Sequence, residues 1–191
     1  NEKRFAKDKK FWDDQLDALG EPLYSDIQGP SVLEEARKRH GNPKLRSSDI
    51  EMKDLFVAVK DYYLEPGPTK NLIDFCMNHQ LSMTNLLLLG IRTYLSKVNN
   101  GQEDITIQNF ISRRSTHDEW TSGGSRTIMF PCRTVIAPET DFLSAAYEIQ
   151  NMQNRIYMHS NYDPAFIMDE MRKRYNTPEH TGYESCYLTY Q

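Results

Sequence analysis

A leucine-rich stretch near the middle of the chain places the tightest constraint on its fold. Ser82 can cap a helix there, and Asn99, Asn100 and Gly101 can supply the turn that ends it. Inside it, apolar residues recur with the i, i+1, i+4 rhythm of a buried stripe: Leu87, Leu88, Ile91, Tyr94, Leu95 and Val98, widened by Leu86 and Leu89. A helix this apolar belongs in a core, and we expect it to lie on a sheet.

Four segments carry the residue types or the alternation that favour β-strands. They are 55–64, which reads LFVAVKDYYL and is followed by Pro66, Gly67 and Pro68, and the alternating segments 104–111, 126–136 and 183–190. Pro131 cannot donate a ladder hydrogen bond, so the third strand needs an edge position, a bulge or a crossing between layers. The polar residues 112–124 between the middle two strands predict a mobile connection.

Five further segments predict helices with one apolar side. The first covers 2–19, with Phe5, Trp12, Leu16 and Leu19 on one side and Gly20 and Pro22 at its end. The others are 32–40 with a Ser31–Glu34 capping box, 70–80 capped by Thr69, 141–159 capped by Thr140 with Phe142 turned inward, and a last helix opened by Asp163 and Pro164. This order suits an α/β (α+β) sandwich in which helices cover a mixed sheet.

Length and charge indicate one lobe-sized unit and exclude several function classes. The 191 residues, 38% of them hydrophobic, suffice for one core, and we treat 1–20 as a lead-in helix and 21–54 as a surface excursion. A net charge of −4 gives no reason to expect nucleic-acid binding. The longest aliphatic run, Leu86 to Leu89, is too short to span a membrane, and residues 1–10 are too charged for a signal peptide. We therefore expect a soluble cytoplasmic protein with neither nucleic acid nor membrane as a partner.

Familiar catalytic and metal-binding patterns are missing from the sequence. Cys76, Cys132 and Cys186 are an odd number of widely spaced cysteines, which fits neither a disulfide framework nor a zinc site, so we expect small buried hydrophobes. The five histidines are scattered singly, and neither G-x-S-x-G, G-x-G-x-x-G nor a P-loop occurs. Gly123-Gly124-Ser125 reads better as a flexible loop than as a nucleophile elbow.

Two groups of polar residues remain as candidates for chemistry. Arg113 and Arg114, with Arg126 and Arg133 beyond, could recognise an acidic group, or could be loop residues in water and a strand residue paired with a carboxylate. His159 stands four residues before Asp163, the H-x-x-x-D spacing of a large class of acyltransferases. Asp163, followed by Pro164, already has the role of a helix N-cap. We therefore interpret His159 as a loop or helix-end residue rather than a base.

Three segments taken in order resemble the condensation domains of non-ribosomal peptide synthetases. They are KDKKFWDDQL, then LIDFCMNHQLSMTNLLLLGIRTYLSKVNNGQEDITIQNFISRR, then the pair GSRTIMFPCR and HSNYDPAFI, and together they cover nearly the whole chain. The resemblance implies two lobes, each similar to a single chloramphenicol acetyltransferase protomer, with a V-shaped cleft between them. This chain resembles the second, C-terminal lobe, because the family's H-H-x-x-x-D-G motif lies on the first lobe and no His-His occurs here.

The resemblance also implies which residues to examine. Gly124, Pro131 and Arg133 match the Gly, Pro and Arg of G-x-F-V-N-x-x-P-L-R, whereas Arg126, Ile128 and Cys132 replace its Phe, Asn and Leu. Arg114 matches the Arg of a Gly-Arg turn, with Arg113 in place of the Gly, and His159, Tyr162, Pro164 and Phe166 match the next motif if Asp163 and Ala165 are extra residues. The candidates for the substrate tunnel are Arg114, Gly124, Pro131, Arg133, His159 and Tyr162, and none is expected to be catalytic. These differences from the family motifs leave open that the chain is a divergent or inactive member of the family.

The reaction that the resemblance implies is amide formation. The amine of an acceptor aminoacyl group attacks the thioester of a donor, both carried on phosphopantetheine arms, and no cofactor is bound directly. The implied partners are the N-terminal lobe, peptidyl carrier domains and an adjacent adenylation domain. This chain alone is expected to be inactive. Two alternatives stay open: a non-catalytic module that docks carrier or neighbouring domains, and a stand-alone CoA-dependent acyltransferase using His159.

Overall fold

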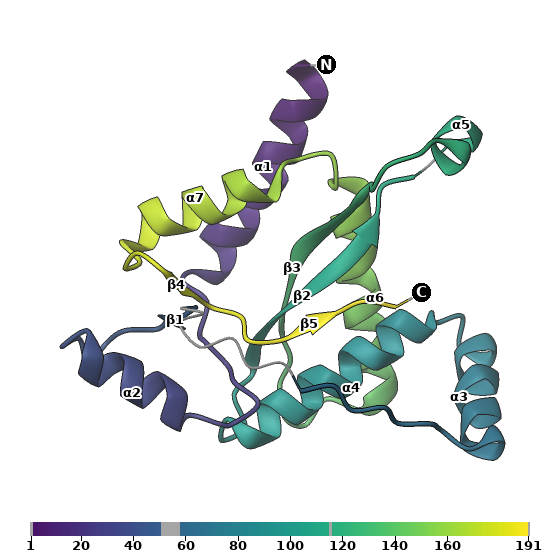
Figure 1. Ribbon diagram of the computed structural model, residues 1–191, viewed down its shortest axis with the longest axis horizontal. Coiled ribbons are helices and arrows are strands. Elements are labelled where there is room, and N and C mark those ends of the chain that lie inside the picture. The colour runs from purple at the N-terminus through teal and green to yellow at the C-terminus, as the bar shows by residue number, and fades with distance from the viewer. Residues whose placement is uncertain (1, 51–57, 115, 191) are drawn as a thin grey trace.

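A β-hairpin covered by helices forms the centre of the molecule (Figure 1). The computed structural model describes residues 2–50, 58–114 and 116–190. The elements are α1 (Glu2–Leu19), α2 (Ser31–Arg39), β1 (Ser48–Asp49), α3 (Pro66–Asn78), α4 (Met83–Val98), β2 (Asp104–Ser112), α5 (His117–Thr121), β3 (Thr127–Val135), α6 (Phe142–Met158), α7 (Pro164–Tyr175), β4 (Thr181–Gly182) and β5 (Tyr187–Leu188).

The sheet is mixed, as the sequence predicts. β2 pairs with β3 antiparallel along its whole length, from Asp104 opposite Val135 to Ser112 opposite Thr127, and β5 pairs parallel to the middle of β2. β1 and β4 form a separate small antiparallel pair. Among the described strands β3 lies at an edge of the sheet, which accommodates Pro131 opposite Gln108.

Two buried clusters divide the core along the hairpin. The first joins α3, α4, the start of β2 and the start of α6, with Leu88, Leu95 and Ile105 fully buried. The second joins α1 and α7 to the far part of the hairpin and the end of α6, around Trp12 and Phe130. The two rings stack in nearly parallel planes, with centroids 5.6 Å apart. α1 and α7 thus pack against the hairpin towards its tip, α4 packs near its open end, and α6 contributes to both clusters.

The predicted strand 55–64 is wrong where the structure describes it. Residues 55–57 lie outside the described residues, and 58–64 carry no regular secondary structure and are exposed, with Tyr63 91% accessible. The aromatic and β-branched composition reports a preference for a pleated surface, but pairing partners decide whether a strand forms. Pro66, Gly67 and Pro68 do not end an element either. They open α3, because a proline in the first turn lacks only an N–H that has no helical partner.

Several caps also differ from the predictions. α2 begins at Ser31 itself without a side-chain cap, and a capping box instead opens α5, where Thr116 and Glu119 exchange hydrogen bonds. Asp141, not Thr140, caps α6. Ser82 caps α4 as predicted, accepting from the Asn85 amide. Where a side chain does cap a described helix it is Ser, Thr or Asp, but which residue serves depends on the path of the preceding loop.

Helix faces and the carboxyl end give the remaining corrections. Four side chains predicted to point inward are substantially exposed: Phe5, Leu19, Tyr94 and Phe142. The N-cap of α3 is Glu65 and not the predicted Thr69. Only the two-residue β4 and β5 form within 181–190, in place of a continuous strand over 183–190. The connection 112–124 contains the short helix α5. All three cysteines are free, with Cys76 and Cys132 buried and Cys186 half-buried.

Candidate functional site

Arg114 and Gly124 lie together at the tip of the hairpin. Arg114 follows β2, and its guanidinium donates to the backbone carbonyls of Glu119, Ser122 and Gly124, the last at 2.5 Å. Gly124 has a φ of +87°, a left-handed conformation that glycine adopts without the steric cost of a side chain. Arg114 therefore closes the loop that carries α5, and the glycine permits the turn.

Arg133 joins the edge strand β3 to the end of α1. Its guanidinium forms a two-pronged pair with Asp104, with Nε–Oδ1 at 2.8 Å and Nη2–Oδ2 at 2.7 Å. It also donates to the carbonyls of Leu19, Gly20 and Glu21, where the end of a helix leaves carbonyl groups without intrahelical partners. The interpretation of Arg133 as a strand residue paired with a nearby carboxylate is confirmed.

His159 ends α6 and is held inside the protein. Its Nδ1 lies 2.8 Å from Oδ1 of Asp8, and its ring stacks on Phe11 with centroids 4.2 Å apart. Asp8 is 2% exposed and His159 9%. Asp163 accepts a hydrogen bond from the Ala165 amide as the N-cap of α7, so it is not directed at the histidine. The prediction that His159 is a helix-end residue is confirmed by this geometry.

Tyr162 is buried beside this pair, against the ring of Phe5 at a centroid distance of 5.3 Å. The six motif-matching residues therefore fall into three places: the hairpin tip, the β3 edge and the junction of α1 with α6. Arg114, Arg133 and His159 each have polar partners within the chain. The polar groups of these three residues are thus bound within the chain, and the six do not form one reacting constellation.

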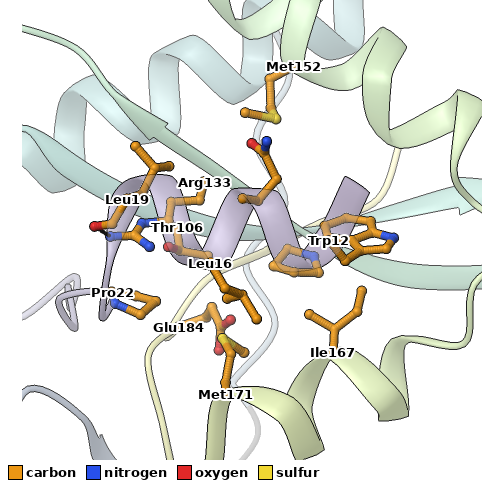
Figure 2. A pocket seen from close by; sticks show the side chains of 12 residues that line it. Trp12, Leu16, Leu19, Pro22, Thr106, Arg133, Met152, Ile167, Met171 and Glu184 are labelled. Atoms are coloured by element: carbon orange, nitrogen blue, oxygen red, sulfur yellow. Dashed lines mark hydrogen bonds between the residues drawn. The ribbon is translucent and has the colours of Figure 1, made fainter. Parts of the chain in front are cut away.

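Pro131 and Arg133 share a cavity between α1, α7 and the sheet (Figure 2). Its walls are mostly apolar, and they include the side chains of Leu16, Met171 and Glu184. Glu184 is buried, and one of its carboxyl oxygens has no partner among the described residues. Burial raises the pKa of this carboxyl group, because the charged form loses hydration.

Sequence reasoning missed the buried polar residues Asp8, Arg92 and Glu184. For the first two a signal exists: Asp8 lies four residues before Trp12, and Arg92 lies between Leu88 and Leu95 at helical spacing, so both fall on buried faces. Burial lowers the pKa of Arg92, whose guanidinium donates to Thr134 and to the carbonyls of Glu103 and Ile136. Two backbone carbonyls, one just before β2 and one just after β3, take the place of a carboxylate there.

The described residues contain no group of three or more His, Cys, Asp or Glu side chains that could hold a metal ion. In the same part of the chain, every helix is too short or too polar to cross a membrane.

A sequence model of the family described as condensation domain matches residues 1–181. The chain belongs to the condensation-domain family. The condensation-domain chain is 22% identical over 170 residues to a plipastatin synthase of Bacillus subtilis (strain 168), an alignment covering 88% of this chain and 6% of that protein.

Solved condensation domains share the fold. The first condensation domain of the calcium-dependent antibiotic synthetase, in complex with a substrate analogue, superposes with a TM-score of 0.70 at 14% identity, over 98% of this chain and 38% of that one. The non-ribosomal peptide synthetase condensation enzyme VibH superposes with a TM-score of 0.61 at 13% identity, over 94% of this chain and 36% of its own. The fold is therefore the chloramphenicol acetyltransferase-like fold of condensation domains, and this chain spans little more than a third of the length of these structures.

Proposed function

We propose that this chain is the C-terminal lobe of a peptide-synthetase condensation domain and forms one wall of the cleft where the amide bond is made. The observation that carries the proposal is a combination: the condensation-domain family covers residues 1–181, while the chain spans 36% to 38% of two solved condensation domains. A second lobe of comparable size would complete the cleft. The H-H-x-x-x-D-G motif, absent from this sequence, would lie on that other lobe.

The wall that we propose is the face of the hairpin that α6 leaves uncovered. Ile105, Ile107 and Ile111 of β2 point to the helices and are buried. Alternation turns the neighbouring residues the other way, and along the far half of the hairpin these are half-buried or exposed. They are Phe110, Ser112, Thr127 and Met129. A pleated surface open on one side suits a wall against which extended substrate arms can lie.

In the proposed reaction the acceptor amine attacks the carbonyl carbon of the donor thioester. The new C–N bond replaces the C–S bond, the amine loses a proton, and the phosphopantetheine thiol leaves. Holding two tethered reactants in line converts a bimolecular step into an effectively unimolecular one, which supplies much of the acceleration. This lobe would contribute orientation and exclusion of water, while the histidine of the other lobe would position or deprotonate the amine.

The burial of His159 is the reason to assign it no catalytic part. A general base has to reach the proton that it removes, and this ring is stacked on Phe11 with Nδ1 committed to Asp8. That geometry disfavours the stand-alone CoA-dependent acyltransferase.

The test compares this chain alone with the same chain joined to the lobe encoded before it in its gene. Each is mixed with donor and acceptor carrier proteins loaded with aminoacyl groups, and the dipeptidyl product is measured by mass spectrometry. We expect product from the joined protein and none from this chain alone. His159→Ala in the joined protein should leave the rate within a few-fold, with His79→Ala as a matched control on a half-buried histidine at the end of another helix.

Three results would overturn the proposal. Amide formation by this chain alone would place the catalyst within it. Loss of acyl transfer in the His159→Ala variant would support the CoA-dependent acyltransferase. Binding of carrier proteins by the joined protein without turnover would support the non-catalytic docking module, to which an adenylation domain could also bind.

A further inference from the structure

A second cavity, separate from the one in Figure 2, lies where the amino end of α1, the hairpin tip and the carboxyl end of α6 meet. Its volume is about 470 Å³, and its described lining consists of Arg4, Ser112, Arg113, Arg114, Glu119, Arg126, Tyr157, Ser160 and Asn161. Four of these residues are arginines, and among the described lining residues Glu119 is the one acidic side chain. A pocket of this size can hold a small organic molecule.

Two of the four arginines have structural roles. Arg114 donates to the three loop carbonyls described above, which fix its position without neutralising its charge. Arg126 pairs with Glu119, with Nη1–Oε1 at 2.5 Å. Glu119 also caps the Thr116 amide in the box that opens α5. The single carboxylate of the lining is therefore used within the loop.

The other two arginines have a weak charged partner or none among the described residues. The Arg113 guanidinium makes no hydrogen bond or ion pair with the described residues, although its backbone amide is held by the carbonyl of Arg126 at 3.1 Å. Arg4 approaches Asp8 only to 4.0 Å, and the other oxygen of Asp8 is bound to His159. Guanidinium groups stay protonated, so their mutual repulsion is relieved when an anion enters.

Neutral donors complete the lining. A tyrosine hydroxyl keeps its proton at neutral pH because its ordinary pKa is about 10, and burial raises the pKa of Tyr157 further. The Asn161 amide has no partner among the described residues. Planar guanidinium groups bind phosphate oxygens through two parallel hydrogen bonds, which a tyrosine and an amide can supplement.

We propose that this pocket binds the phosphate group of a small phosphate-bearing anion through Arg113 and Arg4. The site is argued from its own lining and does not rest on the proposed function, although Ser112 belongs both to this lining and to the proposed wall. Arg113, which stands where the condensation-domain motif has a glycine, supplies the charge particular to this chain.

The test is a titration with inorganic phosphate followed by ³¹P NMR, repeated with phosphopantetheine to separate free phosphate from an organic phosphate ester. We expect saturable binding that Arg113→Gln weakens by about tenfold or more and Arg4→Gln weakens less, since a lost charge-assisted hydrogen bond is worth that much. Arg172→Gln, on the exposed face of α7, removes the same charge elsewhere and is the matched control.

Equal affinities for inorganic phosphate and phosphopantetheine would show that the phosphate group alone is recognised. If phosphopantetheine binds more tightly, and Arg113→Gln still abolishes its binding, the organic part of the ester contributes as well. Both results support the site. Binding that does not saturate, that survives Arg113→Gln, or that falls equally in Arg172→Gln would overturn it. Circular dichroism of each variant confirms that the fold is intact.

Discussion

Replacing Arg133 with methionine gives a direct test of whether this motif-matching arginine is structural. Its guanidinium and the Asp104 carboxylate are 12% and 18% exposed, so the pair is largely but not fully removed from water. The substitution keeps most of the aliphatic stem, but leaves the carboxylate unpaired and the carbonyls of Leu19, Gly20 and Glu21 without this donor.

The expected loss follows from these contacts. Breaking a fully buried ion pair costs about 3–5 kcal/mol, and the residual exposure lets water recover part of that, so we expect a loss of about 2–3 kcal/mol in the free energy of unfolding. Arg133→Lys retains the charge without the planar fork and should lose about half as much. Urea unfolding followed by tryptophan fluorescence measures both variants.

A double-mutant cycle isolates the pair from the carbonyl contacts. Combining Arg133→Met with Asp104→Asn should give a coupling free energy of about 1–2 kcal/mol, because the two side chains meet through two hydrogen bonds. A loss below about 0.5 kcal/mol for Arg133→Met, in the range of ordinary surface substitutions, together with a coupling near zero, would refute the structural role. The residue would then be free to act on substrate.

Three further outcomes follow from buried groups. Burial raises the pKa of Glu184 in the folded protein. The resulting stabilisation is fully present below the pKa of the unfolded state, about 4.3, and is lost as the pH rises through the pKa of the folded state. Glu184→Gln should flatten this pH dependence and raise the urea midpoint at pH 8. His159→Gln should cost about 1–2 kcal/mol in urea unfolding, since it strips Asp8 of its buried partner, and an unchanged midpoint would contradict the pairing. Burial raises the pKa of the Cys132 thiol to about 11, so a chromogenic disulfide reagent at pH 8 should leave it unmodified until urea is added, while the half-buried Cys186 reacts earlier; rapid modification of Cys132 in the folded protein would count against this.

Local chemistry made several elements readable from the sequence. Gly20 takes the left-handed conformation that ends α1, Ser82 caps α4, and Asp163 with Pro164 opens α7, because each of these needs only residues close in the chain. The alternation of 104–111 and 126–136 likewise predicted two strands, since one face of each strand has to be buried, whereas their antiparallel pairing came from the structure.

Other elements depend on partners that are distant in the chain. The segment 58–64 has strand-like composition but is exposed, because composition cannot specify a neighbouring strand. Asp8 and His159 are 151 residues apart, and nothing in the local pattern of either predicts their contact. The same holds for the cavity with four arginines, which collects residues from α1, the hairpin and α6.

The sequence by itself determined the family, the order of the main helices and of the two long strands, and the exclusion of His159 as the obvious base, since each rests on spacing along the chain. Only the tertiary structure decided what the arginines do. Arg114 and Arg133 bind carbonyls and a carboxylate within the chain. In the shared cavity, Arg113 has no side-chain partner among the described residues, and Arg4 approaches Asp8 only to 4.0 Å. Whether a guanidinium is structural or available to a ligand depends on which acceptors folding brings within hydrogen-bond distance.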